Sequence, residues 1–139
     1  MTTNSTPVLQ ALLLADHIYT DQSGKRVICG TFSKIFAPEF PSVFNGPVWA
    51  FILLTDVVGK VVLQLRFVHL SDNQILMEST PIEIKSDDPL QALDIALQIP
   101  GFPLPEAGVY SFECYADTTM IGSVRLQVMK VHSQESADD

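Results

Sequence analysis

Residues 104–117, LPEAGVYSFECYAD, decide the fold class, because their apolar side chains fall at every second position. In an extended chain Tyr110, Phe112 and Cys114 share one side, while Glu113 points to the other. This period of two is typical of a β-strand with one buried face. The segment therefore predicts a strand near residues 108–117 that packs against a second layer.

The same alternation continues through most of the chain, and short groups of turn residues interrupt it. It predicts eight strands, near residues 8–19, 25–36, 47–55, 60–70, 74–85, 92–99, 108–117 and 121–131. The segment DDPLQALDIALQ also fits a helical turn at its start, with Asp88 as the cap and Pro89 at the first position. That alternative stays open from the sequence.

Two of the predicted strands depart from simple alternation. The segment VWAFILL, within 47–55, is apolar on both faces, so it is either a central strand covered twice or a strand packed against another molecule. Pro81 lies inside the segment 74–85 and has no N–H to donate to a neighbouring strand. We therefore expect an edge strand or a bulge at Pro81.

The last two strands predict a hairpin with a defined register. The apolar side chains of both strands must reach the same side, and a slip of one residue would move them to the opposite face. Pairing Phe112 with Leu126 and Cys114 with Val124 satisfies this condition and leaves a three-residue loop, 118–120. The outer face then carries two opposite charges directly across from one another, Glu113 and Arg125.

Eight short strands joined by short turns favour an all-β antiparallel sandwich, and a closed barrel is the alternative. At 139 residues the chain is expected to form one domain, residues 1–132, followed by a short acidic tail, residues 133–139. The sequence contains no repeat and no linker.

The start of the strand near 108–117 resembles the tyrosine corner of immunoglobulin-like sandwiches, through Gly108-x-Tyr110. The resemblance implies that the phenol oxygen bonds to the backbone of the preceding loop. Cys29, Trp49 and Cys114 also resemble the core set of immunoglobulin domains. The residue two places after Tyr110, however, is not a cysteine. We therefore expect two free thiols and no disulfide.

Most of the chain also resembles a family of small bacterial β-sandwich proteins of unknown function. The shared features are an early aspartate, a glycine-lysine turn, a G-x-F strand, a Pro-x-x-Pro loop and the late corner. In this chain they are Asp16, Gly24-Lys25, Gly30-x-Phe32, Pro38-x-x-Pro41 and Gly108-x-Tyr110. The resemblance implies a fold and no activity.

Composition excludes several classes of function. The net charge of −8 opposes binding to phosphate backbones and anionic lipid, so we expect neither nucleic acid nor a membrane as a partner. The apolar run ALLLA is too short for a membrane span, and no basic residue precedes it as in a secretory signal. We expect a soluble, cytoplasmic protein.

Two ends of the predicted sandwich are candidate surfaces. Antiparallel strands bring alternate loops together, so one end collects aspartates that could bind calcium or serve only their own turns. These are Asp21, Asp56, Asp87, Asp88 and Asp117. The other end collects six of the nine prolines and an apolar set that either plugs the sandwich or binds a protein: Phe40, Phe44, Phe102 and Leu104.

No cofactor motif or catalytic motif is present in the sequence, and His17, His69 and His132 lack metal-like spacing. We therefore predict a non-enzymatic protein-binding or assembly module without a cofactor, and this module could bind a second copy of itself. The first alternative is a calcium-dependent binding domain. The second is an enzyme with a site built from residues such as Asp16, His17 and Glu113.

Overall fold

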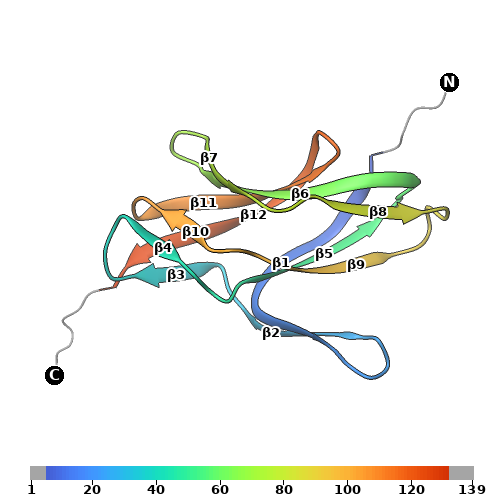
Figure 1. Cartoon of the computed structure of the whole chain (residues 1–139), viewed down its shortest axis with the longest axis horizontal. Coiled ribbons are helices and arrows are strands. Elements are labelled where there is room, and N and C mark those ends of the chain that lie inside the picture. Colours follow the sequence, from blue (N-terminus) through green and yellow to red (C-terminus); the bar gives the residue numbers. More distant parts are fainter. Residues whose placement is uncertain (1–5, 132–139) are drawn as a thin grey trace.

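The computed structural model describes residues 6–131, and these residues form twelve strands and no helix (Figure 1). The strands are β1 (Val8–Thr20), β2 (Arg26–Thr31), β3 (Lys34–Ala37), β4 (Ser42–Phe44), β5 (Trp49–Thr55), β6 (Gly59–His69), β7 (Gln74–Glu78), β8 (Ile82–Ser86), β9 (Leu93–Gln98), β10 (Phe102–Leu104), β11 (Gly108–Ala116) and β12 (Thr119–Lys130). The predicted acidic tail, residues 133–139, and His132 lie outside this range.

The strands form two packed sheets and a short ribbon. One sheet has the order β2-β1-β5-β9, and the other has the order β3-β12-β11-β6-β7, with β8 also paired to β6. The ribbon β4–β10 lies near the left-hand end of the molecule in Figure 1. All pairings are antiparallel except β3 with β12. The predicted antiparallel sandwich is therefore confirmed, and the barrel alternative is excluded.

The strand order is that of an immunoglobulin-like sandwich. The neighbours β6-β11-β12 follow the order C-F-G, and β1-β5-β9 follow the order A-B-E. The chain crosses from the first sheet to the second between β2 and β3, at Phe32 and Ser33. The β1–β2 hairpin is thus inserted before the chain reaches the second sheet.

The core lies between the sheets and is dominated by aromatic side chains. Phe67 and Tyr110 stack with ring centroids 5.0 Å apart and planes 4° apart, and Phe102 lies 4.4 Å from Phe67. With Phe112, these side chains are at most 1% exposed. Burial of each ring contributes roughly 1.5–3 kcal/mol, so this cluster is a main source of the sandwich's stability.

Three features of the strand prediction are wrong in detail. The predicted strand 25–36 is two strands, because the crossing at Phe32–Ser33 divides it between the sheets. The predicted strand 74–85 is β7 and β8, which end on either side of residues 79–81 and both pair with the edge of β6. The short strands β4 and β10 were not predicted. At the position of the helical-turn alternative the chain makes one turn, in which Asp88 Oδ1 accepts from the Leu90 N–H and the Asp88 carbonyl oxygen accepts from the Gln91 N–H.

The apolar strand β5 is central in its sheet, between β1 and β9. Its even-numbered side chains face the core, and its odd-numbered side chains are half-buried on the outer face, namely Trp49, Phe51 and Leu53. The central position is observed, but the outer face is only half-buried and has no second cover within residues 6–131, so packing of this face against another molecule stays a prediction. No helix within residues 6–131 has the length and apolar character that crossing a membrane requires.

The β11–β12 hairpin has a register two residues away from the predicted one. Phe112 pairs with Val124 instead of Leu126. The predicted three-residue loop is a two-residue turn, because Asp117 takes a positive φ of 56° and lets the strands close sooner. A bulge after Cys114 absorbs the remaining residue.

This shift has different consequences for the two faces of the hairpin. A displacement by two residues keeps each side chain on its face, so the predicted inward set of Tyr110, Phe112 and Cys114 is buried. The predicted charge pair is wrong, because Glu113 pairs with Ser123 on β12 and with Arg66 on β6.

Candidate functional site

The predicted tyrosine corner is present at the start of β11. The Tyr110 hydroxyl donates a hydrogen bond to the Glu106 carbonyl oxygen at 2.6 Å and accepts one from the Glu106 N–H at 3.3 Å. Burial raises the pKa of the phenol, so it stays a neutral donor. The corner fixes the β10–β11 loop to the core, which is a structural role.

A buried histidine extends this corner. His69 at the end of β6 is 4% exposed and stacks on the Tyr110 ring with centroids 4.6 Å apart. Its Nε2 lies 3.1 Å from Glu106 Oε2, and its Nδ1 lies 3.5 Å from Asp72 Oδ1. The carboxylates approach different ring nitrogens, so they do not converge on one point where an ion would sit. The cluster instead links the loops that follow β6 and β10.

The sequence placed His69 on a strand face without assigning it this contact. The signal in the sequence that could have indicated its burial was the alternation of the strand, since Leu65, Phe67 and His69 occupy every second position on the inward face. The acidic partners come from two separate loops, and no local pattern joins them.

The predicted aspartate set is spread over turns. Where the structure gives a contact, the carboxylate bonds to backbone N–H groups or to a hydroxyl, within its own loop for Asp21 and across to β6 for Asp117. Asp21 Oδ1 accepts hydrogen bonds from the Ser23 N–H, the Ser23 hydroxyl and the Lys25 N–H at 2.7–2.9 Å. These bonds favour the charged form and lower the pKa of Asp21, with the Ser23 hydroxyl as the largest cause. Asp117 Oδ1 accepts from the Val62 N–H at 3.1 Å.

The loops that follow β5 and β8 do meet. The Asp56 N–H donates to the Pro89 carbonyl oxygen at 2.8 Å, and Asp88 Oδ1 accepts from the Leu90 N–H at 3.0 Å. Asp87 is exposed next to them. Across residues 6–131, however, no three histidine, cysteine or acidic side chains are arranged to hold a metal ion.

The proline-rich and phenylalanine-rich end lies around the β4–β10 ribbon. Phe102 and Leu104 are each 1% exposed and belong to the core, so neither side chain is available to a partner. Phe44 pairs with Phe102 at 5.6 Å between centroids, and Phe40 is half-buried against the core. The position of this set matches a plug that closes the sandwich.

The three residues that the enzyme alternative would combine into one site lie apart. Asp16 is exposed and lies over Gly30, and His17 stacks on Tyr19 within the β1–β2 hairpin. Glu113 lies on β11 in the other sheet, where it accepts a hydrogen bond from the Tyr115 hydroxyl at 2.8 Å. The fold does not bring these three side chains to one site.

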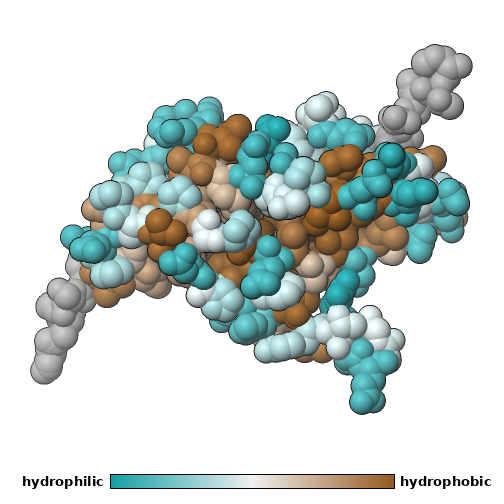
Figure 2. All heavy atoms as spheres, in the orientation of Figure 1, coloured by the Kyte–Doolittle hydropathy of each residue, from teal (hydrophilic) through white to brown (hydrophobic). Residues whose placement is uncertain are grey.

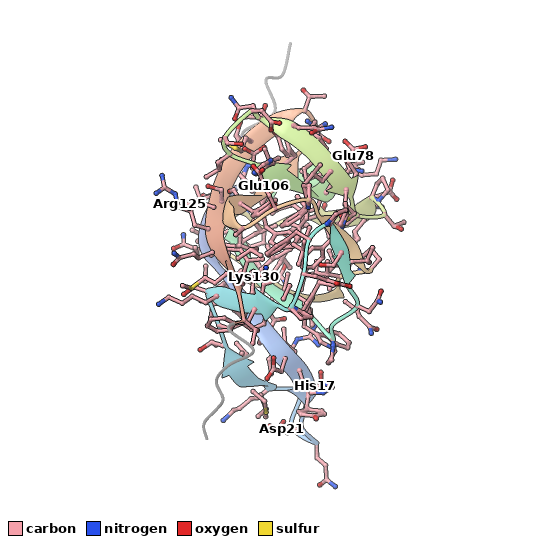
Figure 3. All side chains as sticks on the ribbon, turned by 90° about the vertical axis from the view of Figure 1, so that its left-hand side faces the viewer. His17, Asp21, Glu78, Glu106, Arg125 and Lys130 are labelled. Carbon is pink, nitrogen blue, oxygen red and sulfur yellow. The ribbon has the colours of Figure 1, made fainter. Side chains whose placement is uncertain are left out.

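The β1–β2 hairpin is the most distinctive surface feature. It extends below the body of the sandwich in Figure 1, and Figure 3 shows His17 and Asp21 on the same projecting arm. Tyr19 and Val27 are cross-strand neighbours on it, 54% and 43% exposed. Arg26 ties the arm to β9, with Nε 3.5 Å from Asp94 Oδ2. The hairpin thus presents apolar side chains on a ribbon anchored to the sandwich.

Comparison with known proteins gives a family and a weak structural likeness. Residues 10–129 match a family of unknown function, DUF6941, and the chain belongs to that family. No protein among the curated ones matches. An immunoglobulin-like protein from Pseudomonas aeruginosa, solved at 1.50 Å, is similar to this chain at 9% identity and a TM-score of 0.42, covering 91% of this chain and 99% of its own.

Proposed function

We propose that this chain is a non-enzymatic protein-binding or assembly module that uses the β1–β2 hairpin as its contact surface. The observation that supports this role is the exposed Tyr19–Val27 pair on a projecting ribbon. Aromatic residues contribute disproportionately to protein interfaces, because they bury a large area at small entropic cost. The two free cysteines, Cys29 and Cys114, support a reducing, cytoplasmic location for this module.

The hairpin differs from other exposed apolar positions of the chain. Figure 2 shows apolar side chains scattered among hydrophilic ones over the visible face, as on most proteins. On the hairpin, Tyr19 and Val27 lie directly opposite one another, and His17 stacks on Tyr19 with ring centroids 5.6 Å apart. These side chains form one continuous strip instead of isolated positions.

The test compares two substitutions of equally exposed aromatic residues. Tyr19→Asp places a charge on the hairpin strip, and Phe36→Asp places one on β3, where Phe36 is 56% exposed. Light scattering and capture from a cell extract are measured for both variants and the wild type. We expect Tyr19→Asp to abolish association and Phe36→Asp to preserve it. Equal association of both variants with the wild type would refute the proposed surface.

A further inference from the structure

The free edge of β2 is an unprotected strand edge. Within residues 6–131, β2 pairs with β1 on one side only and ends the sheet β2-β1-β5-β9. Its six residues include no proline, and its only charged residue is Arg26 at the first position. An edge of this kind exposes a row of backbone N–H and C=O groups to pairing with another strand.

The other edges of the two sheets carry features that block such pairing. β9 bears Asp94 in its interior and is soon followed by Pro100, and β3 has only four residues. The β7–β8 edge is interrupted around Pro81, and β8 carries Glu83 and Lys85. Charges, prolines, short strands and interruptions are the usual means of protecting edges. In β2 such features are confined to its two ends, Arg26 at the first position and Gly30 with a positive φ of 74°, so Val27–Cys29 is unprotected.

Charge determines which partner fits this edge. The chain carries a net charge of −8, whereas the hairpin segment 16–31 contains two acidic residues, Asp16 and Asp21, and two basic ones, Lys25 and Arg26, so its formal charge is zero. Two copies of an acidic chain would repel one another at most surfaces but meet at this segment without net repulsion.

Antiparallel pairing of β2 with the β2 of a second copy also brings opposite charges close together. Such a pairing is two-fold symmetric, so it sets the beginning of one strand against the end of the other. The basic beginning contains Lys25 and Arg26, and the end contains Gly30, over which the Asp16 carboxylate lies. A Cβ at Gly30 would be 2.6 Å from Asp16 Oδ2, so the absent side chain leaves room for this carboxylate near the edge.

We propose that two copies of the chain pair β2 to β2 in antiparallel fashion around Ile28, joining two four-stranded sheets into one continuous eight-stranded sheet. This inference rests on the proposed function and names a second copy as the partner. Pairing around Ile28 sets Val27 of each copy beside Cys29 of the other, and it extends the Tyr19–Val27 strip across the two-fold axis.

The first test changes the edge itself. Val27→Lys introduces a protective charge in the middle of β2. Val109→Lys makes the same change on β11, where Val109 is 41% exposed against 43% for Val27. Sedimentation equilibrium of the purified proteins is measured over a range of concentrations. We expect twice the monomer mass for the wild type and for Val109→Lys, and the monomer mass for Val27→Lys. A dimer that persists in a folded Val27→Lys variant would overturn the inference.

A second test, by disulfide cross-linking, applies even if the lysine destabilises the hairpin. Val27→Cys sets an introduced thiol beside Cys29 of the second copy, so mild oxidation is expected to give a covalent dimer, and adding Cys29→Ala should reduce it at least tenfold. Equal cross-linking in both backgrounds would overturn the inference. A wild type that is monomeric throughout, with partner capture that still depends on Tyr19, would overturn the self-pairing and leave the proposed function standing.

Discussion

At the residue scale, the Tyr110 side chain packs in the core with its ring and forms hydrogen bonds to a loop backbone with its hydroxyl. Its ring lies between Phe67 and His69, and its hydroxyl satisfies both backbone groups of Glu106. A buried polar group without a partner would cost more than the bond itself contributes. The corner therefore stabilises the sandwich only while both hydrogen bonds are present.

Replacing Tyr110 by phenylalanine tests this role. Tyr110→Phe keeps the ring stacking but leaves the Glu106 backbone groups without the hydroxyl, so we expect a loss of about 1–3 kcal/mol in the free energy of unfolding. Tyr115→Phe is the control, because the Tyr115 hydroxyl donates to the Glu113 side chain on the outer face and satisfies no loop backbone, so its loss should cost less than about 1 kcal/mol. Urea denaturation measures both, and equal costs would contradict the structural role of the corner.

The two thiols should differ in reactivity. Burial raises the pKa of Cys114 to about 11, so at pH 8 this side chain is almost entirely the unreactive thiol. Cys29 is half-buried on the hairpin. We expect one thiol per folded chain to react with Ellman's reagent at pH 8, and two in guanidinium chloride.

The Cys29→Ala variant completes this experiment. Because its remaining thiol is Cys114, the folded variant should show no fast reaction. Rapid labelling of the folded variant would mean that the core around Cys114 opens readily.

At the element scale, the sequence predicted the long strands well and the short ones poorly. β6 and β11 alternate over many residues, so their faces could be assigned from Leu63, Leu65 and Phe112 alone. β4 and β10 have three residues each, and β10 contains Pro103, so no period can be measured over them. Their pairing depends on the long connection that brings them together, which no local pattern specifies.

The hairpin register shows a second limit. Two registers that differ by two residues bury the same side chains, so hydrophobic pattern alone cannot choose between them. The choice is made by the turn, where Asp117 adopts a positive φ, and by the bulge after Cys114. The same ambiguity explains why the core residues could be predicted from the sequence while the Glu113–Arg125 pair could not.

Strands β1 and β12 approach closely at one edge of the sandwich, and Gly122 permits this. A Cβ on Gly122 would overlap Leu9 Cδ2, the far end of a flexible side chain. Because the end of this side chain can rotate away, we expect Gly122→Ala to destabilise the protein by at most about 1.5 kcal/mol, the cost of an off-rotamer side chain. Adding Leu9→Ala should remove the overlap, so the cost of the glycine change should fall in that background. Thermal melts of the four variants measure the coupling, and strict additivity would contradict this contact.

At the scale of the whole molecule, the loops that carry the predicted aspartates do not form a common site. Asp21 is held within the turn of the projecting hairpin, and Asp117 is bonded to β6. Only the loops carrying Asp56 and Asp88 are joined, through the backbone of Pro89. Turn hydrogen bonds hold the Asp21 carboxylate in its own loop, and the Asp117 carboxylate accepts from the backbone of β6, so neither is directed to a shared site.

Calcium binding is tested at this scale. Because the carboxylates with resolved contacts already accept hydrogen bonds from backbone N–H groups or a hydroxyl, we expect the melting temperature to be unchanged by millimolar calcium relative to magnesium. A rise of several degrees with calcium alone would contradict this expectation and point to the aspartate loops. Asp56→Asn would then show whether the joined loops are responsible.

The parallel pairing of β3 with β12 also constrains how the chain is made. Lys34 pairs with Gln127, and 127 − 34 = 93 residues separate them. An emerging polypeptide therefore cannot complete this part of the second sheet until Gln127 has left the ribosome. During synthesis β3 is unpaired until β12 has been made. A nascent chain arrested before Gln127 would therefore expose an incomplete sandwich to chaperones and proteases.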